Sequence, residues 1–249
     1  MIFSLHGGHN SIVQGANSGN RKEHIMDRQV KDAVAGKLRA LGHTVYDDTD
    51  EVGSTQNANL NNIVAKCNSH KVDLVVSFHL NAYNGSANGV EVCYYDQQAL
   101  AAKVSAQLAK DIGWFNRGAK ERKELAVLAR TTAPAILLEL GFIDNEGDMA
   151  KWNVDKIANS IVYALTGQTV SGGGSTGGGT VNTAAIQSGG FGFSEAPTVM
   201  GKMVEFGVTG KLVVQLDGLC YVVTDRIDEK KIWKLDNYFA ARGWWFMYI

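Results

Sequence analysis

The sequence predicts an α/β protein with a mixed, mostly parallel sheet flanked by helices, followed by a small α+β domain. Strand-length apolar runs alternate with segments of helical period through residue 166, which is the rhythm of βαβ units. The run at residues 72–82 is apolar and β-branched over most of its length, as in strands buried on both faces of a sheet. A glycine-rich run at residues 172–179 then separates a shorter C-terminal segment.

Composition bounds the class of protein. The 249 residues are 45% hydrophobic and 20% charged, which suffices for one full core and a second, smaller one. The formal net charge of -1 argues against nucleic acid as a partner. The three cysteines, Cys67, Cys93 and Cys220, show no paired spacing, so we expect free thiols.

The sequence also carries information on targeting. No apolar run reaches the roughly 20 residues that a membrane span needs. The first five residues lack both the basic start and the apolar length of a signal peptide. We therefore expect no membrane span and a protein that is made and folded in a cytoplasm.

The elements of the first domain are predicted in order along the chain. A strand at residues 2–5 runs into His6-Gly7-Gly8-His9, and a polar loop extends to residue 20. A helix with one apolar face opens at residues 21–23 and ends at Gly42. Further strands are predicted at residues 43–46, 72–82, 89–95, 125–129 and 135–140, and further helices around 60–67, at 97–112 and at 144–166.

Polar side chains stand at the ends of several of these elements. His79 ends the run at residues 72–82, and Glu139 interrupts an apolar strand, where burial is costly unless the carboxylate has a partner or a role. Glu23 lies in the first turn of a helix, where the dipole favours a carboxylate. Taken alone, His79 could be a histidine of the core, and Glu23 could simply stabilise the start of its helix. His6 and His9 are alternative candidates for a second histidine of the site.

A zinc hydrolase site accommodates these residue types. Such a site takes about three protein ligands and leaves one position for water, and histidine and glutamate are suitable donors. His9, Glu23 and His79 would supply the three ligands. Glu139 would then take the proton from the water that the metal activates and return it to the leaving amine. Periodicity alone does not show that the four side chains meet.

Over about residues 2–167 the chain resembles the zinc-dependent N-acetylmuramoyl-L-alanine amidases of the third amidase type, which occur in bacterial autolysins and phage endolysins. The family opens on Gly-His, and its Gly-Ala pair and ligand Glu stand six and fourteen residues past that histidine. This spacing selects Gly8-His9, Gly15-Ala16 and Glu23, whereas His6 fails both steps and is read as a neighbour of the site. The family motifs Ser-x-His-x-Asn-Ala and Leu-x-Glu-x-Gly-Phe-x-x-Asn are present at residues 77–82 and 137–145.

The resemblance implies that His9, Glu23 and His79 hold one zinc ion and that Glu139 is the catalytic carboxylate. Residues 116–120 and Pro134 also fit, and the substrate contacts implied are Asn81, Glu91, Arg117 and Lys120. The chain departs from the family at three places, which bear on loop shape and substrate contacts: Asn10 in place of a second Gly, Val13 in place of an Asp, and Thr49-Asp50 in place of an Arg-Thr pair.

The tail is predicted as a doubled βαβ. Its strands are expected at residues 185–187, 211–216, 220–224 and 244–248, and its helices at 194–206 and 228–241. The opening at residues 187–191 loosely resembles the SPOR modules that bind the glycan chains of peptidoglycan. Trp244, Trp245 and Tyr248 could stack on sugars, although apolar residues on a closing strand more often belong to the core.

Together these features predict an enzyme that cuts the amide between N-acetylmuramic acid and L-alanine in peptidoglycan. Residues 1–168 would form the catalytic domain, 169–182 a Gly/Ser-rich linker and 183–249 a cell-wall-binding domain. This order and the missing signal peptide favour a phage endolysin that stays in the host bacterial cytoplasm until lysis and depends on a holin for release. Two alternatives remain: a mother-cell autolysin of the same activity, and a non-catalytic wall-binding protein.

Overall fold

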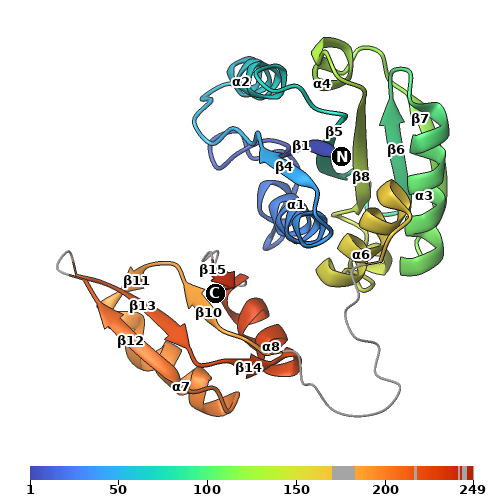
Figure 1. The fold of residues 1–249 in the computed structure, drawn as a ribbon. Helices are drawn as coiled ribbons and strands as arrows, with labels where there is room; N and C mark the ends of the chain where they lie inside the picture. Colours follow the sequence, from blue (N-terminus) through green and yellow to red (C-terminus); the bar gives the residue numbers. More distant parts are fainter. Residues whose placement is uncertain (170–182, 216–217, 241, 243–245, 249) are drawn as a thin grey trace. The chain divides into compact units, whose positions relative to one another are not determined.

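The chain divides into two compact units, Met1–Val170 and Ser171–Ile249 (Figure 1). This computed structural model describes residues 1–169, 183–215, 218–240, 242 and 246–248. The predicted linker, residues 169–182, lies outside the described residues except at its first position. Each unit is therefore described by itself.

The first unit is organised around a six-stranded sheet (Figure 1). All neighbouring strands are parallel except β6 and β8, which are antiparallel, so the predicted mixed, mostly parallel sheet is confirmed. In spatial order the strands are β4 (Thr44–Asp47), β1 (Ile2–Gly7), β5 (Leu74–Asn81), β8 (Ala135–Phe142), β6 (Val90–Tyr94) and β7 (Asn116–Glu121).

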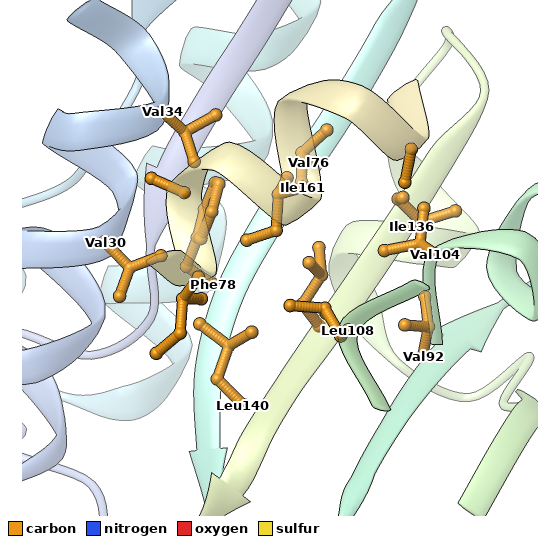
Figure 2. Packing of buried hydrophobic residues seen from close by; sticks show 14 of the residues in the cluster. Val30, Val34, Val76, Phe78, Val92, Val104, Leu108, Ile136, Leu140 and Ile161 are labelled. Atoms are coloured by element: carbon orange, nitrogen blue, oxygen red, sulfur yellow. The ribbon is translucent and has the colours of Figure 1, made fainter. Parts of the chain in front are cut away.

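Three helices cover one face of this sheet: α1 (Glu23–Ala40), α3 (Gln98–Ile112) and α6 (Val154–Thr166). Figure 2 shows Val30 and Val34 of α1 and Ile161 of α6 packed near Val76 and Phe78 of β5. The opposite face carries α2 (Gln56–Asn68) and α4 (Ala126–Arg130). The remaining short elements are β2 (Asn17–Ser18) and β3 (Arg21–Lys22), which pair ahead of α1, and α5 (Glu146–Met149).

Strand alternation decides which side chains reach the second face. Phe78 points into the core with α1, so its neighbours Ser77 and His79 point to the opposite side of the sheet. On that side the apolar cluster under α2 and α4 includes Val75 of β5 and Leu137 of β8. On this face, the apolar residues Val75 and Leu137 are followed, towards the carboxyl ends of β5 and β8, by the polar residues His79 and Glu139.

One local prediction was wrong, and one strand was missed. Residues 125–129, predicted as a strand, form α4, because a five-residue apolar run fits a helix as well as a strand and Val127 and Leu128 bury against α2. Strand β7 (Asn116–Glu121) was not predicted, because it is an edge strand of polar and charged residues without the alternation that marks a half-buried strand.

The second unit contains a five-stranded antiparallel sheet backed by two helices (Figure 1). Strand β10 (Ile186–Ser188) leads through η1 (Phe193–Glu195) and α7 (Ala196–Glu205) to β12 (Gly210–Val214), and β13 (Leu219–Thr224) leads through α8 (Glu229–Ala240) to β15 (Phe246–Tyr248). β13 lies between β10 and β12, and β10 lies between β13 and β15, so each predicted βαβ connection crosses over one strand. The short strands are β11 (Phe191–Gly192), β9 (Thr183–Ala184) and β14 (Ile227–Asp228).

Two further expectations concern the chain as a whole. The three cysteines are free, as predicted, and all three are buried. Within the described residues, no helix is both long enough and apolar enough to cross a membrane.

Candidate functional site

His9, Glu23 and His79 come together at the carboxyl ends of β1 and β5. His9 follows β1, Glu23 is the first residue of α1, and His79 lies near the end of β5. His79 Nδ1 lies 2.9 Å from Glu23 Oε1, and His9 Nε2 lies 3.5 Å from Glu23 Oε2. One nitrogen or oxygen atom of each residue lies within 4.8 Å of the others. The structure thus brings together His9 and Glu23, which the family spacing selected, and His79, which lies in the family motif at residues 77–82.

The backbone holds the Glu23 carboxylate in place. Ala16 N donates to Oε2 at 2.7 Å and Leu80 N donates to Oε1 at 3.1 Å. Burial alone would raise the pKa of this carboxyl, but the hydrogen bond and charge of His79, with His9 and Ala16, leave its pKa below the usual value. Glu23 is therefore an ionised carboxylate with a fixed orientation.

Two glycines make room for this arrangement. A Cβ atom on Gly8 would lie 2.0 Å from His79 Cε1. Gly15 has φ +72°, and a Cβ there would lie 2.4 Å from Glu23 Oε2 and 2.4 Å from His9 Cδ2. Because real Cβ atoms do not approach other atoms so closely, any other residue at either position would displace the histidines or the carboxylate.

His9 itself has a strained backbone. Its φ of 56° is left-handed, and no other non-glycine residue in the described ranges has a positive φ. This conformation costs a residue with a side chain about 1–2 kcal/mol, and such strain is found mostly at functional sites. The adjacent Asn10, fully buried, closes the loop by accepting from Ile12 N and Val13 N and donating to Gly53 O.

The donor set fits a tetrahedral metal ion. Two ligand atoms about 2.0–2.1 Å from one such ion lie about 3.3 Å apart. His79 Nδ1 lies 2.9 Å from Glu23 Oε1 and His9 Nε2 lies 3.5 Å from Glu23 Oε2, so each histidine is near that distance from one of the two carboxylate oxygens. Burial and the charge of His79 lower the pKa of His9, which keeps its imidazole neutral and able to coordinate.

The environment of His79 favours positive charge. Burial alone would lower the pKa of His79, but the hydrogen bond and charge of Glu23, together with Glu139 and Asp27, raise it to about 9. Without a metal ion the imidazole therefore carries a proton at neutral pH. An ionised Glu23 with the carboxyl groups of Glu139 and Asp27 around one imidazole is an environment that suits a bound cation.

Glu139 lies next to this triad. It pairs with His79 on β5 and with Glu91 on β6 in the register of the sheet. Its Oε2 is buried and has no hydrogen-bond partner among the described residues. Burial, helped by Glu23 and Glu91 and opposed by His79, raises the pKa of Glu139 to about 7. The carboxyl can therefore gain or lose a proton near neutral pH.

The residues expected to contact substrate divide into a cluster and an outlier. Arg117 Nε donates to Glu91 Oε2 at 2.7 Å, Asn81 Nδ2 donates to Glu91 Oε1 at 3.4 Å, and the Arg117 guanidinium lies 5.0 Å from the Phe142 ring centroid. Glu91 brings this cluster beside Glu139. Lys120 pairs with Cys93, two positions further along β6, and so lies farther from Glu139.

His6 lies outside the triad. It is fully buried, with Nδ1 3.5 Å from Ser77 Oγ and 3.4 Å from Gly7 O. Burial, with the charge of His79, lowers its pKa to about 3, so the ring is neutral. The structure therefore places His6 as a neighbour of the site.

Sequence reasoning missed two residues of the site, Asp27 and Arg28. Asp27 is fully buried, and burial raises its pKa to about 8 despite the adjacent Arg28. Arg28 is mostly buried and reaches the backbone of the His9 loop. The available signal was the position of Asp27 four residues after Glu23, which puts both on one face of α1.

Comparison with known proteins gives the family. The profile of N-acetylmuramoyl-L-alanine amidases matches residues 1–167. The chain belongs to this amidase family. The catalytic domain of CD27L, an endolysin targeting Clostridia difficile, superposes on this amidase with TM-score 0.62 at 28% identity, covering 68% of this chain and 99% of that one.

Two curated relatives are also similar to the amidase domain. The probable cell wall amidase LytH of Staphylococcus saprophyticus is 33% identical over 149 residues, which cover 57% of this chain and 47% of LytH. An uncharacterized cell wall amidase of Bacillus anthracis is 30% identical over 161 residues, covering 59% of this chain and 29% of that protein. The aligned part thus spans less than half the length of either relative.

The tail matches a different family from the one expected. The profile of the PlyG cell wall binding domain matches residues 205–248, whereas the sequence suggested a SPOR module. The SPOR resemblance rested on residues 187–191, which lie outside this match. Trp244 and Trp245 lie outside the described residues, and only the backbone of Tyr248, in β15, is described.

Proposed function

We propose that this chain is a zinc-dependent peptidoglycan hydrolase that cuts the amide between N-acetylmuramic acid and L-alanine. The observation that carries the proposal is the triad of His9, Glu23 and His79 with the carboxyl of Glu139 beside it. Membership of the amidase family supports this reaction. A non-catalytic wall-binding role is disfavoured because it would leave the strain at His9 and the buried carboxylates without a purpose.

In this proposal His9, Glu23 and His79 hold one zinc ion. When bound, zinc polarises the scissile carbonyl and lowers the pKa of a water molecule at its open position. Glu139 takes the proton from the attacking water as the new C–O bond forms. It then gives that proton to the amide nitrogen as the C–N bond breaks, which releases the lactyl carboxylic acid and the amino group of L-alanine; the acid then loses the second water proton to solvent. A carboxyl with pKa about 7 can perform both transfers at neutral pH.

Neighbouring polar groups would orient the substrate. Asn81, Glu91 and Arg117 form one hydrogen-bonded cluster at the same end of the sheet as Glu139. The Arg117 side chain is 33% exposed and can bind a carboxylate of the stem peptide while it stays paired with Glu91. Lys120 would contact more distant parts of the substrate.

For the second unit we propose anchoring to the cell wall. The match to the PlyG cell wall binding domain and the likeness to an endolysin catalytic domain support the role of a phage endolysin. Such a protein would remain in the host cytoplasm until a holin opens the membrane. A holin gene beside the coding sequence would support this role, and a bacterial chromosomal context without one would favour the autolysin.

The activity can be tested on purified cell wall. The zinc-loaded chain should release new amino groups that dinitrophenyl labelling identifies as L-alanine, with no new reducing sugar ends. Metal analysis should find about one zinc per chain. New reducing ends without L-alanine amino groups would make the protein a glycosidase and contradict the proposal.

The two competing histidines give a direct test of the ligand set. His79→Ala should lose the zinc, because it removes one of three ligands. His6→Ala should keep it, because His6 contacts Ser77 and lies outside the triad. Full zinc content in His79→Ala, or its loss in a folded His6→Ala, would show that the ligands are assigned wrongly.

A further inference from the structure

Arg28 reaches from helix α1 to the backbone on both sides of the His9 Cα atom. Its Nη2 donates to His9 O at 2.9 Å, and its Nη1 donates to Gly8 O at 3.0 Å. The side chain is only 16% exposed, so water does not compete freely for these bonds. No other side chain in the described ranges hydrogen-bonds both of these carbonyls; Asn59 Nδ2 makes a longer bond, of 3.4 Å, to His9 O.

The same guanidinium also joins the segments that carry the other two ligands. Nη1 donates to His24 O at 2.8 Å, one residue past Glu23. Gly8, whose carbonyl Arg28 binds, donates its N–H to Phe78 O at 2.9 Å, one residue before His79. Arg28 is therefore linked by hydrogen bonds to the chain next to all three residues of the triad.

The chemistry of arginine suits this task. A guanidinium offers five N–H donors in a rigid plane, so it can bind several carbonyl oxygens at once and fix their relative positions. The positive charge of Arg28 also favours the approach of two carbonyl oxygens, Gly8 O and His9 O. These carbonyls flank His9, where φ is 56° and the backbone is left-handed. A lysine ammonium has the charge but lacks the planar fork.

An ordinary stabilising ion pair is the competing explanation. Arg28 Nε contacts Glu51 Oε1 at 2.8 Å, and Nη1 lies 3.1 Å from Asp27 Oδ1. The Glu51 side chain is 58% exposed, so that pair contributes little to folding. The bonds to Gly8 and His9 use different nitrogens from the Glu51 contact, so a substitution of Glu51 removes that ion pair and leaves them in place. The Asp27 contact shares Nη1 with the Gly8 bond.

We propose that Arg28 is a positioning residue for the metal centre: it holds the His9 backbone in the left-handed conformation from which the imidazole joins Glu23 and His79. The inference rests on the proposed function, because the triad must hold a metal ion for its position to matter. Arg28 touches none of the reacting atoms and acts through His9. It therefore sets metal affinity rather than the chemical step.

The decisive experiment compares two arginines of α1 in the full chain. Arg28→Met keeps the aliphatic stem and removes the donors. Arg39→Met is the matched control, because Arg39 Nη2 also donates to a backbone carbonyl, Val45 O at 2.9 Å, away from the triad. Zinc affinity is measured by competition with a chromophoric chelator, and the visible absorption of the Co²⁺-loaded protein reports the ligand geometry.

We expect zinc affinity to fall about 10- to 100-fold in Arg28→Met, the usual effect of losing a group that orients a ligand. The Co²⁺ absorption should change with it. Arg39→Met and Glu51→Gln should keep both wild-type values even if their melting temperatures fall. If Arg28→Met does not fold, Arg28→Lys takes its place and should bind zinc more weakly than wild type.

Two results overturn the inference, and they are distinguishable. Wild-type zinc affinity and Co²⁺ absorption in a folded Arg28 variant would show that Arg28 only stabilises the fold, and would leave the amidase proposal intact. A wild-type chain that binds no zinc would refute the proposed function and the positioning role together.

Discussion

At the scale of single residues, the site is a group of carboxylates around two histidines. Glu23, Glu139 and Asp27 all raise the pKa of His79, to about 9, although burial opposes them. The backbone donors at Ala16 and Leu80 stabilise only Glu23. Burial leaves Glu139 and Asp27 with raised pKa values, so the three carboxyls differ in charge near neutral pH. This difference supports the proposal that Glu23 binds the metal ion and Glu139 transfers the proton.

Glu139→Gln tests the proton transfer. The amide keeps the size of the side chain but cannot accept the proton, so we expect kcat to fall roughly 10²- to 10⁴-fold with zinc content and melting temperature near wild type. Glu91 is a poor substitute because Arg117 holds its Oε2 at 2.7 Å. Retained activity would nevertheless implicate Glu91, and loss of zinc would make Glu139 a ligand.

Asp27→Asn tests the buried carboxyl beside Arg28. Burial raises the pKa of Asp27 from 3.8 to about 8. Because the folded-state value is the higher one, Asp27 stabilises the fold fully below pH 3.8, and this contribution is lost as pH rises towards 8. Without metal, the melting temperature of wild type should therefore fall relative to that of Asp27→Asn as pH rises from about 4 to 8, because the variant has no carboxyl at this position to ionise. Thermal unfolding with a chelator present measures this difference.

The control for this test is Asp32→Asn. Asp32 lies on the same helix, and its side chain is 67% exposed. Its substitution should give a difference in melting temperature that stays nearly constant over the same pH range. A constant difference for Asp27→Asn as well would mean that the Asp27 carboxyl is ionised throughout.

The three side chains of the triad could be selected from the sequence because each lies within a short local motif. Gly8-His9, Glu23 and the stretch around His79 have fixed spacings that do not depend on the rest of the fold. Arg28 has no such motif, because its role depends on which carbonyls the folded loop turns towards α1. Asn10 was seen only as a departure from the family. In the structure its side chain supplies the hydrogen bonds that close the loop.

At the scale of elements, the site depends on loops that pass very close to the triad. Gly15→Ala should place a methyl group 2.4 Å from Glu23 Oε2, so we expect loss of bound zinc. Gly19→Ala is the matched control, because Gly19 is also left-handed, with φ +57°, but a Cβ there meets nothing within 4 Å. Both variants should lose some stability, and only Gly15→Ala should lose zinc on metal analysis. Equal zinc content in the two would show that the loop can move aside.

The elements were predictable where burial was strong. The central strands β5 and β8 bury both faces and show as apolar runs, and α1 shows the helical period. Strand β7 lies at the edge of the sheet and gains its hydrogen bonds from β6, so its polar sequence carries no strand signal. Helix α4 is only five residues long, too short for periodicity to distinguish it from a strand.

At the scale of the whole molecule, the chain has two units with separate cores. The clusters around β5 and β8 contain only residues of the first unit. The cluster around Ile186, Val222 and Phe239 contains only residues of the second. Each unit therefore buries its own apolar surface, which is the physical requirement for folding alone.

Separating the units should divide catalysis from anchoring. We expect residues 1–170 to fold, to keep zinc and to cut solubilised wall fragments at a rate near that of the full chain, because the triad and Glu139 all lie in this part. On intact walls the same fragment should be slower, because it lacks the segment that matches a cell wall binding domain. Residues 180–249 alone should sediment with Gram-positive walls, and Glu139→Gln in the full chain should bind walls without cutting them. A tail that sediments with no wall, together with a fragment 1–170 that matches the full chain on intact walls, would refute anchoring and leave the tail a structural module.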